Sequence, residues 1–471
     1  MTAPVPLTPF IQEVVNQIQD RQRLAAGIRA CTARERDFAS TQEMLLAGIA
    51  MIPEAREMVS DAITRNWAKN AATFNAEAIA KKSDFRDREF IVGGGFHAAV
   101  YAANRVRTGF RRPIVLEQNP AGKAGGAFAM SLNPVFRLNS RSRPGTAGLP
   151  DQDKALNFLP GGLLQPAMIS SEEYPTNADM AWLIRLTLAQ YAVVYPGVSV
   201  TEIRGEGGNN ESATLATSSG DITVGRVVDA RGIGTENQLG TADGERVLTF
   251  SQLMTRMGGM FPLRGIRQVA VIGGPDGNGN GGDSGKCAVE SMLGIAPGHT
   301  SAIGLDYIDR ADWYTELGNG QTCDDFRQSQ RGRYIRIAQY LDGNVSNPST
   351  RLRVIGQRGY KTPMPDGVLV NDRTYDMAVL CTGSTRADLN PQGLSFFAVR
   401  GPGVTNRGTV LATRAAPFPY YRIGPCADIP FSDTEIQSGI TDIPANKVAI
   451  FRLAPRTAAL AGMLPGVGTQ A

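Results

Sequence analysis

The sequence is poor in the side chains that metal sites and acid–base catalysis usually need. Only two histidines, His97 and His299, occur in 471 residues, so a histidine dyad or a histidine-rich metal site has almost no residues available. The five cysteines are scattered, with neither a C-x-x-C pair nor a metal-ligand spacing. This excludes a zinc site and a dithiol redox centre. We therefore expect no metal, and we expect a cofactor to carry the chemistry.

A strong net charge and long apolar runs are also lacking. The formal net charge is +4, with both signs interspersed, which argues against nucleic acid or a polybasic membrane patch as a partner. No apolar run approaches membrane-spanning length, and the first residues do not resemble a secretion signal. We expect a cytoplasmic protein, long enough for about three domains, that acts on a small molecule.

The most informative stretch lies between residues 89 and 103. A short apolar strand meets three glycines and continues as an Ala-rich helix, which is the order of a dinucleotide-binding turn, G-x-G-x-x-A. Gly93 permits the tight turn, Gly95 lets the backbone approach a diphosphate, and Ala99 keeps helix and strand close. Glu117 ends the next apolar strand, where an acid binds the ribose hydroxyls. A structural turn without ligand is the alternative, but the register of all these parts favours a nucleotide site.

A second strand of this kind runs from residue 268 to Gly273 and Gly274. A Gly/Asn-rich insertion, residues 275–280, separates it from a helix that begins near Ser284. The pattern predicts a second dinucleotide-binding unit with an enlarged phosphate loop. The next strand ends in Asp309-Arg310; Asp309 suits the ribose of NADH and Arg310 the 2′-phosphate of NADPH, so the choice stays open there. Later arginines at 327, 331, 333 and 336 favour NADPH modestly.

The residues before the first strand, from Pro9 to about Lys82, have apolar positions at helical spacing. We predict a helical extension. Three roles stay open for it: covering the entrance of an active site, forming a subunit contact in a homo-oligomer, or simply packing on the nucleotide domain.

Two further strands run into glycines, Asp229-Ala230-Arg231-Gly232 and Cys381-Thr382-Gly383. Together with the two nucleotide units, this order resembles the flavoproteins with two dinucleotide-binding domains. More narrowly, it is similar to the single-component flavin monooxygenases, which include the N-hydroxylases and Baeyer–Villiger enzymes. The second glycine strand matches the Ala-Thr-Gly crossover of that superfamily, whereas the first departs from it by carrying Ala-Arg-Gly. The resemblance covers residues from about Phe85 to the C-terminus.

The resemblance implies an α/β fold with two Rossmann-like, doubly wound dinucleotide-binding domains after the helical extension. The expected divisions are 1–85 for the extension, 86–262 for the first part of the FAD domain, 263–383 for the NAD(P)H domain and 384–471 for the second part of the FAD domain. The residues that it places at FAD or NADPH are Gly93, Gly95, Phe96, His97, Ala99, Glu117, Gln118, Gly126, Phe128, Arg137, Gly273, Gly274, Gly282, Ser284, Arg310, Gly383, Gly424 and Pro425.

In such a flavoprotein the Gly-rich loop at 122–128 runs beneath the flavin. The arginines and asparagine after it would then meet flavin, nicotinamide or an anionic substrate, and solvated loop side chains are the alternative. This makes the candidates for catalysis Arg137, Asn139 and Arg141, with Arg143 beside them.

The leading hypothesis is an FAD-dependent monooxygenase that uses NADPH and oxygen to hydroxylate a small molecule through a flavin C4a-hydroperoxide. The Baeyer–Villiger signature F-x-G-x-x-x-H-x-x-x-W is missing, which disfavours that branch, and the absence of C-x-x-C sets aside the disulfide reductases. Two alternatives remain. One is an FAD-dependent dehydrogenase, oxidase or reductase without oxygen insertion, and the other is a flavin-binding structural protein whose NADPH site has decayed.

Overall fold

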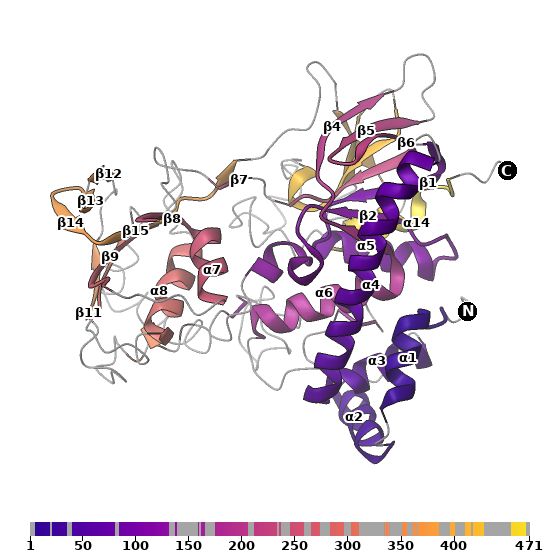
Figure 1. Cartoon of the computed structure of the whole chain (residues 1–471), viewed down its shortest axis with the longest axis horizontal. Helices are drawn as coiled ribbons and strands as arrows, with labels where there is room; N and C mark the ends of the chain where they lie inside the picture. The colour runs from indigo at the N-terminus through magenta and orange to yellow at the C-terminus, as the bar shows by residue number, and fades with distance from the viewer. Residues whose placement is uncertain are drawn as a thin grey trace.

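The computed structural model describes these residues: 5–18, 21–34, 40–80, 84–130, 137–138, 159, 162–164, 175–205, 212–232, 235–236, 245–258, 265–273, 283–295, 303–309, 334, 336–337, 339, 351–355, 361–364, 366–385, 396–400, 410–415, 418–427 and 454–467. Two separate β-sheets organise this part of the chain, and Figure 1 shows them in two lobes. No helix within it is both long and apolar enough to cross a membrane.

The first sheet has nine strands, and its main path runs in the order β17-β18-β19-β6-β1-β2-β3. Five of these strands are mutually parallel: β19, β6, β1, β2 and β3. Parallel strands are usually covered by helices on both faces, which is why their residues are mostly apolar. β4 and β5 form an antiparallel hairpin on β6. The bounds are β1 (Asp84–Val92), β2 (Ile114–Glu117), β3 (Val193–Pro196), β4 (Val200–Gly205), β5 (Ala213–Thr217), β6 (Gly220–Asp229), β17 (Phe396–Arg400), β18 (Val410–Ala415) and β19 (Tyr420–Arg422).

Three helices pack together beside this sheet: α5 (Phe96–Arg107), α6 (Asn177–Tyr191) and α14 (Ala454–Met463). The preference of asparagine for helix N-caps predicts Asn177 as the cap of α6 from the sequence, and this prediction is wrong by one residue. Thr176 is the cap: its hydroxyl accepts the N–H of Asp179 at 3.1 Å, and the Asp179 carboxylate accepts the N–H of Thr176 at 3.3 Å. This reciprocal capping box satisfies two backbone donors, and Asn177 instead donates from its side chain to the carbonyl of Phe128.

The second sheet is parallel throughout, in the order β11-β10-β9-β15-β8. It therefore shows the strand pattern of a Rossmann-like unit. A small antiparallel sheet, β12-β13-β14, accompanies it. The bounds are β8 (Val247–Thr249), α7 (Phe250–Gly258), β9 (Gln268–Gly273), α8 (Asp283–Ile295), β10 (Gly304–Asp309), β11 (Arg351–Ile355), β12 (Lys361–Met364), β13 (Gly367–Val370), β14 (Arg373–Tyr375) and β15 (Met377–Cys381).

A two-stranded antiparallel ribbon connects the two lobes. It consists of β7 (Thr235–Glu236) and β16 (Ser384–Thr385). β7 follows the end of β6 in the first sheet, and β16 follows the end of β15 in the second. The two glycine crossovers that we read in the sequence thus lead into neighbouring strands, and Figure 1 shows β7 between the lobes.

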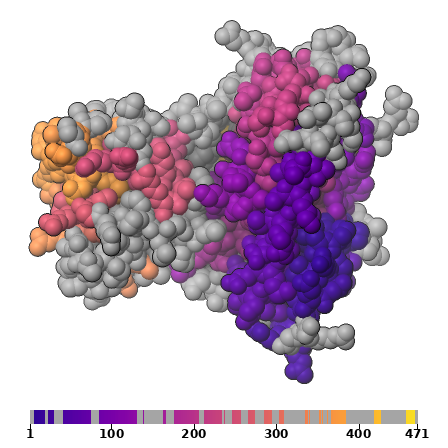
Figure 2. Space-filling model, in the orientation of Figure 1, coloured from indigo at the N-terminus to yellow at the C-terminus, as the bar shows by residue number. Residues whose placement is uncertain are grey.

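The N-terminal extension is helical, as predicted, with four helices: α1 (Pro9–Gln17), α2 (Arg21–Arg34), α3 (Thr41–Ala50) and α4 (Pro53–Ala80). α4 packs on β3, the edge strand of the first sheet, and Asn70 donates to the carbonyl of Val194 at 3.1 Å. Covering an edge strand in this way protects its unpaired backbone groups. In Figure 2 the indigo extension lies directly against the purple first lobe. Packing on the first lobe is therefore observed, and the other two roles stay predictions.

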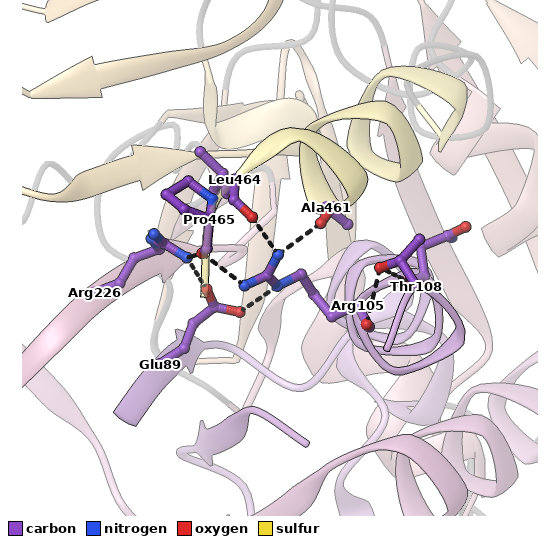
Figure 3. A network of polar contacts seen from close by, with 8 residues as sticks. Glu89, Arg105, Thr108, Arg226, Ala461, Leu464 and Pro465 are labelled. Atoms are coloured by element: carbon purple, nitrogen blue, oxygen red, sulfur yellow. Dashed lines mark hydrogen bonds and ion pairs between the residues drawn. The ribbon is translucent and has the colours of Figure 1, made fainter. Parts of the chain in front are cut away.

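A buried charge network joins the end of the chain to the first sheet (Figure 3). Glu89 of β1 accepts from Arg105 Nε at 3.1 Å and from Arg226 at 2.5 Å. Arg105 also donates to the carbonyl of Ala461 in the last turn of α14 and to those of Leu464 and Pro465 directly after this helix. The carboxylate and guanidinium groups are 7 % exposed or less. Their pairing compensates the desolvation of each charge, and it holds α14 against β1 and α5.

Candidate dinucleotide site

The first glycine of the fingerprint has the geometry of a tight turn. Gly93 has φ +95°, and its N–H donates to the carbonyl of Leu116 at 2.8 Å. A Cβ on Gly93 would lie 3.1 Å from both the carbonyl oxygen of Ala230 and the Cα of Arg231. Because the backbone is left-handed and the crossover after β6 lies so close, glycine suits this position.

Glu117 lies directly beside the same turn. Its Oε2 accepts the N–H of Gly94 at 2.7 Å, and its Oε1 accepts the backbone N–H and side-chain amide of Asn119 at 2.8 and 2.7 Å. The side chain is buried, and burial raises the pKa of Glu117 even though these donors oppose the rise. A carboxylate fixed at the end of β2 has the position and chemistry needed to accept hydrogen bonds from ribose hydroxyls.

The Gly-rich loop after β2 lies on the third glycine of the turn. Gly126 has φ +66°, and a Cβ there would lie 2.7 Å from the Cα of Gly95. Gly95 is the N-cap residue of α5, and no side chain among the described residues caps this helix start. Helix N-terminal N–H groups without a cap, together with the positive end of the helix dipole, attract anions. The two glycines bring a second backbone segment to that point.

The two residues after Gly95 face the protein interior. The ring of His97 is buried, with Nδ1 2.9 Å from the hydroxyl of Thr457 in α14. A Cβ on Gly424 (φ +64°) would lie 2.3 Å from His97 Cδ2. Phe96 packs edge-on against His97 at 5.1 Å between ring centroids. Both rings therefore pack within the protein, and the predicted cofactor contacts of these residues stay predictions.

The remaining predicted residues of the first unit lie around this point. Ala99 is fully buried inside α5, whereas Gln118 is exposed. Phe128 is half-buried in the short helix η2 (Gly126–Met130), and its carbonyl accepts the amide of Asn177. Arg137 pairs through its backbone with Thr176, so it lies beside the start of α6. The other candidates of this segment, Asn139, Arg141 and Arg143, lie outside the described residues.

The C-terminal glycine motif closes over the start of α5. Gly424 and Pro425 are buried in the short helix η7 (Gly424–Ala427), which follows β19. Gly424 touches the His97 ring, as noted above, so η7 lies near the fingerprint. Whether these residues contact a cofactor stays a prediction.

The arginine that distinguishes the crossover at residues 230–232 from the Ala-Thr-Gly pattern has a structural role. Arg231 folds back on its own strand and donates from Nε and Nη2 to the two oxygens of Asp229, at 2.9 and 2.8 Å. Asp229 is fully buried and also accepts the hydroxyl of Tyr420 at 2.8 Å. The arginine thus compensates a buried carboxylate. Gly232 follows with φ +80°, a left-handed backbone that glycine adopts without strain.

In the second unit the glycines surround an aromatic ring. A Cβ on Gly273 would lie 2.7 Å from the hydroxyl oxygen of Tyr307, and a Cβ on Gly285 would lie 2.5 Å from its Cε2. Tyr307 is buried on β10, and Ser284 is buried at the start of α8. These two glycines are therefore required for close packing of α8 on the sheet, whether or not a phosphate binds. The predicted nucleotide contacts of Gly273 and Ser284 stay predictions.

Of the other residues predicted for the second unit, Gly383 is among the described residues. Gly383, with φ +86°, follows β15, whose Cys381 pairs with Gly273 of β9. The two glycines thus lie at the same, carboxyl edge of the sheet, where ligands of such folds bind. Gly274, Gly282, Arg310 and the 275–280 insertion lie outside the described residues.

One residue that the sequence analysis missed is Arg185 of α6. It donates to the carbonyls of Ala121 and Ala124 in the Gly-rich loop, at 2.7 and 2.9 Å. The signal available was a single arginine inside the apolar stretch from Met180 to Ala189. A charge in such a stretch indicates a buried partner, but the sequence does not show which partner.

Comparison with solved structures agrees with this architecture. The ornithine N-hydroxylase KtzI of Kutzneria sp. 744, solved with reduced FAD, NADP+ and L-ornithine, matches at a TM-score of 0.52 and 15% identity, over 79% of this chain and 97% of that chain. This chain has the fold of a two-dinucleotide-binding flavoprotein. No protein-family model matches the sequence, and no curated protein matches it.

Two further solved structures are similar to this flavoprotein fold at lower scores. L-lysine 6-monooxygenase of Pseudomonas syringae has a TM-score of 0.49 and 15% identity, over 80% of this chain and 99% of that chain. DfoA of Erwinia amylovora, a cadaverine monooxygenase bound to FAD, has a TM-score of 0.46 and 12% identity, over 80% and 95%.

Proposed function

We propose that this protein is an FAD-dependent oxidoreductase whose FAD binds at the first glycine turn. The observation that carries the proposal is the arrangement of Gly93, Gly95, Glu117 and Gly126. The start of α5 has no side-chain cap, Gly126 packs on Gly95 there, and the buried Glu117 carboxylate accepts the N–H of Gly94 in the same turn. These groups fit the phosphates and ribose of a dinucleotide.

Bound FAD would supply the electron and hydride transfer, for which the protein side chains have no equivalent. The protein's own part is to bind and orient. Glu117 would hold the adenosine ribose, the α5 start would hold the diphosphate, and η7 with the 121–130 loop would exclude water from one side. NADPH is the proposed reductant, at the carboxyl edge of the second sheet near Gly273 and Gly383.

The proposed reaction is the NADPH- and oxygen-dependent hydroxylation of a small molecule, at nitrogen. The shared fold with an ornithine N-hydroxylase supports this proposal, and so does the shortage of histidine for other acid–base chemistry. Small amines are therefore the first substrates to test.

The test begins with an absorbance spectrum of the purified protein. We expect the bands of oxidised flavin, bleaching by NADPH without oxygen, and recovery when oxygen is admitted. Oxygen and NADPH consumption with a panel of amines, together with mass spectrometry for a product heavier by one oxygen atom, tests the reaction. Protein that purifies and reconstitutes without any flavin contradicts the proposal.

Two other functions remain as candidates. One is a flavoprotein that transfers electrons without inserting oxygen, and the other is a flavin-binding protein that has lost the NADPH site. The packing of Tyr307 against Gly273 and Gly285 supports the lost NADPH site alone, because it accounts for both glycines without a nucleotide. Rapid anaerobic turnover with an artificial electron acceptor would indicate a dehydrogenase or reductase. Retained flavin that neither NADPH nor NADH bleaches would indicate the lost site.

A further inference from the structure

Arg185 is a buried cation whose hydrogen bonds all go to uncharged groups. The residue is 7 % exposed. One terminal nitrogen donates to the carbonyls of Ala121 and Ala124, at 2.7 and 2.9 Å, and the other donates to the hydroxyl of Thr64 at 2.8 Å. The guanidinium carbon lies 4.8 Å from the centre of the Trp67 ring. Arg185 thus joins α6 to the Gly-rich loop on one side and to α4 of the extension on the other.

The positive charge of Arg185 has no negative partner in the described part of the chain. No carboxylate there lies within ion-pair distance of it, and burial lowers the pKa of Arg185 to about 10. Buried charges in proteins are usually paired, because leaving water costs several kcal/mol. Carbonyl dipoles and a tryptophan face offset part of this cost. A bound anion nearby would offset more.

The loop that Arg185 holds leads directly to the glycine turn. A Cβ on Gly125 would lie 3.5 Å from Arg185 Cγ, and the next residue, Gly126, touches Gly95 at the start of α5. Arg185 therefore holds residues 121–125 of this loop, and the next residue of the loop contacts the start of α5, where backbone N–H groups attract anions.

We propose that Arg185 is a positioning residue of the dinucleotide site. It fixes residues 121–126 against Gly95, and its unpaired charge stabilises the diphosphate bound at the start of α5 through space. Thr64 and Trp67 hold the guanidinium in place, so the N-terminal extension becomes part of the support of the cofactor site. This inference rests on the proposed function.

The experiment measures the FAD dissociation constant of the deflavinated full chain by quenching of flavin fluorescence. The variants are Arg185→Gln and Arg185→Lys. The matched control is Arg56→Gln, because Arg56 also joins α4 to α6, through Asp179 at 3.0 Å and the Trp182 ring, without touching the loop. Each variant is also melted with and without FAD.

We expect Arg185→Gln to weaken FAD binding roughly tenfold or more, as for the loss of hydrogen bonds from a charged group. Its gain in melting temperature on adding FAD should shrink. Arg185→Lys, which keeps the charge, should recover part of the affinity. Arg56→Gln should lower the melting temperature equally with and without FAD and leave the dissociation constant within about twofold.

Unchanged FAD affinity in Arg185→Gln would overturn the inference while leaving the proposed function intact. So would a loss no larger than that of Arg56→Gln. Should Arg185→Gln not fold, Thr64→Val replaces it: weaker FAD binding supports the inference, and wild-type binding overturns it. Wild-type protein that binds no FAD overturns the proposed function, and the inference with it.

Discussion

The carboxylate of Glu117 accepts the backbone N–H of Gly94 at 2.7 Å, which joins the end of β2 to the turn after β1. A Cβ on Gly94 would lie 2.9 Å from the same oxygen. A side chain at this position would therefore displace the Glu117 carboxylate from its hydrogen bond. The acid and the turn act as one structural unit, and this unit leads to the first prediction.

Replacing Glu117 by Gln should weaken FAD binding by roughly 10- to 100-fold, the range expected for the loss of charge-assisted hydrogen bonds. The amide oxygen can still accept from Gly94, whereas the NH2 group that replaces the other oxygen cannot accept from Asn119, so those two hydrogen bonds are lost. Fluorescence titration of the deflavinated protein measures the effect, and circular dichroism checks the fold. Glu117→Gln protein with wild-type affinity for FAD would show that the ribose lies elsewhere.

Replacing Gly126 by Ala should destabilise the loop and weaken FAD binding. The left-handed backbone alone costs about 1–2 kcal/mol with a side chain, and the new Cβ would lie 2.7 Å from the Cα of Gly95. Gly122→Ala is the matched control in the same loop, because Gly122 is exposed and a Cβ there would meet no atom within 4 Å. Urea unfolding and FAD titration of both variants are the measurements, and equal effects would contradict the close contact of the two glycines.

The extension should contribute a pH-dependent part to the stability. Glu43 of α3 is buried, accepts the hydroxyl of Tyr191, and has its Oε2 without a partner among the described residues. Burial raises the pKa of Glu43, against the opposing effects of Arg107 and Tyr191. The folded protein therefore binds a proton more tightly than the unfolded chain. As pH rises from about 4.5 through the raised pKa, the contribution of Glu43 to the free energy of unfolding should fall.

Glu43→Gln tests this sign. The difference in unfolding free energy between wild type and Glu43→Gln should change with pH by no more than about 1.4 kcal/mol per pH unit, with the wild type losing stability on the alkaline side. Glu54→Gln is the control, since Glu54 is exposed and pairs with Arg23 on the surface. A wild type that gains stability relative to Glu43→Gln as pH rises would reverse our assignment.

The buried network around Glu89 should be important for stability. Glu89→Ala leaves Arg105 and Arg226 buried without their carboxylate, which typically costs about 3–5 kcal/mol. Asp87→Asn, two residues earlier in β1, breaks only the exposed pair with Arg111 and should change stability by less than about 1 kcal/mol. Chemical denaturation of both variants gives the comparison. Limited proteolysis should also cut the segment after Ala461 sooner in Glu89→Ala, because Arg105 holds its carbonyls.

The elements around the first turn could be predicted because their signals are local. The apolar residues before Gly93, the alanines after Gly95 and the acid at Glu117 follow each other within 29 residues, and their periodicity is that of strand, turn and helix. Capping was predicted less well. Thr176 and Asp179 form the spacing of a capping box, yet we chose Asn177, since residue preference alone does not separate two adjacent polar residues.

The order of strands, glycines and acids along this chain was sufficient to indicate a flavoprotein-like α/β architecture, because hydrophobic periodicity and turn chemistry depend on near neighbours. Contacts across long separations were decided by folding alone. The sequence does not show that Arg185 binds a loop 61 residues away, that His97 meets Gly424, or that Tyr307 is the reason for two glycines. These partners depend on which faces of the helices and sheets pack together. Once buried, each polar group has to form a hydrogen bond with a donor or acceptor that the packing brings close to it.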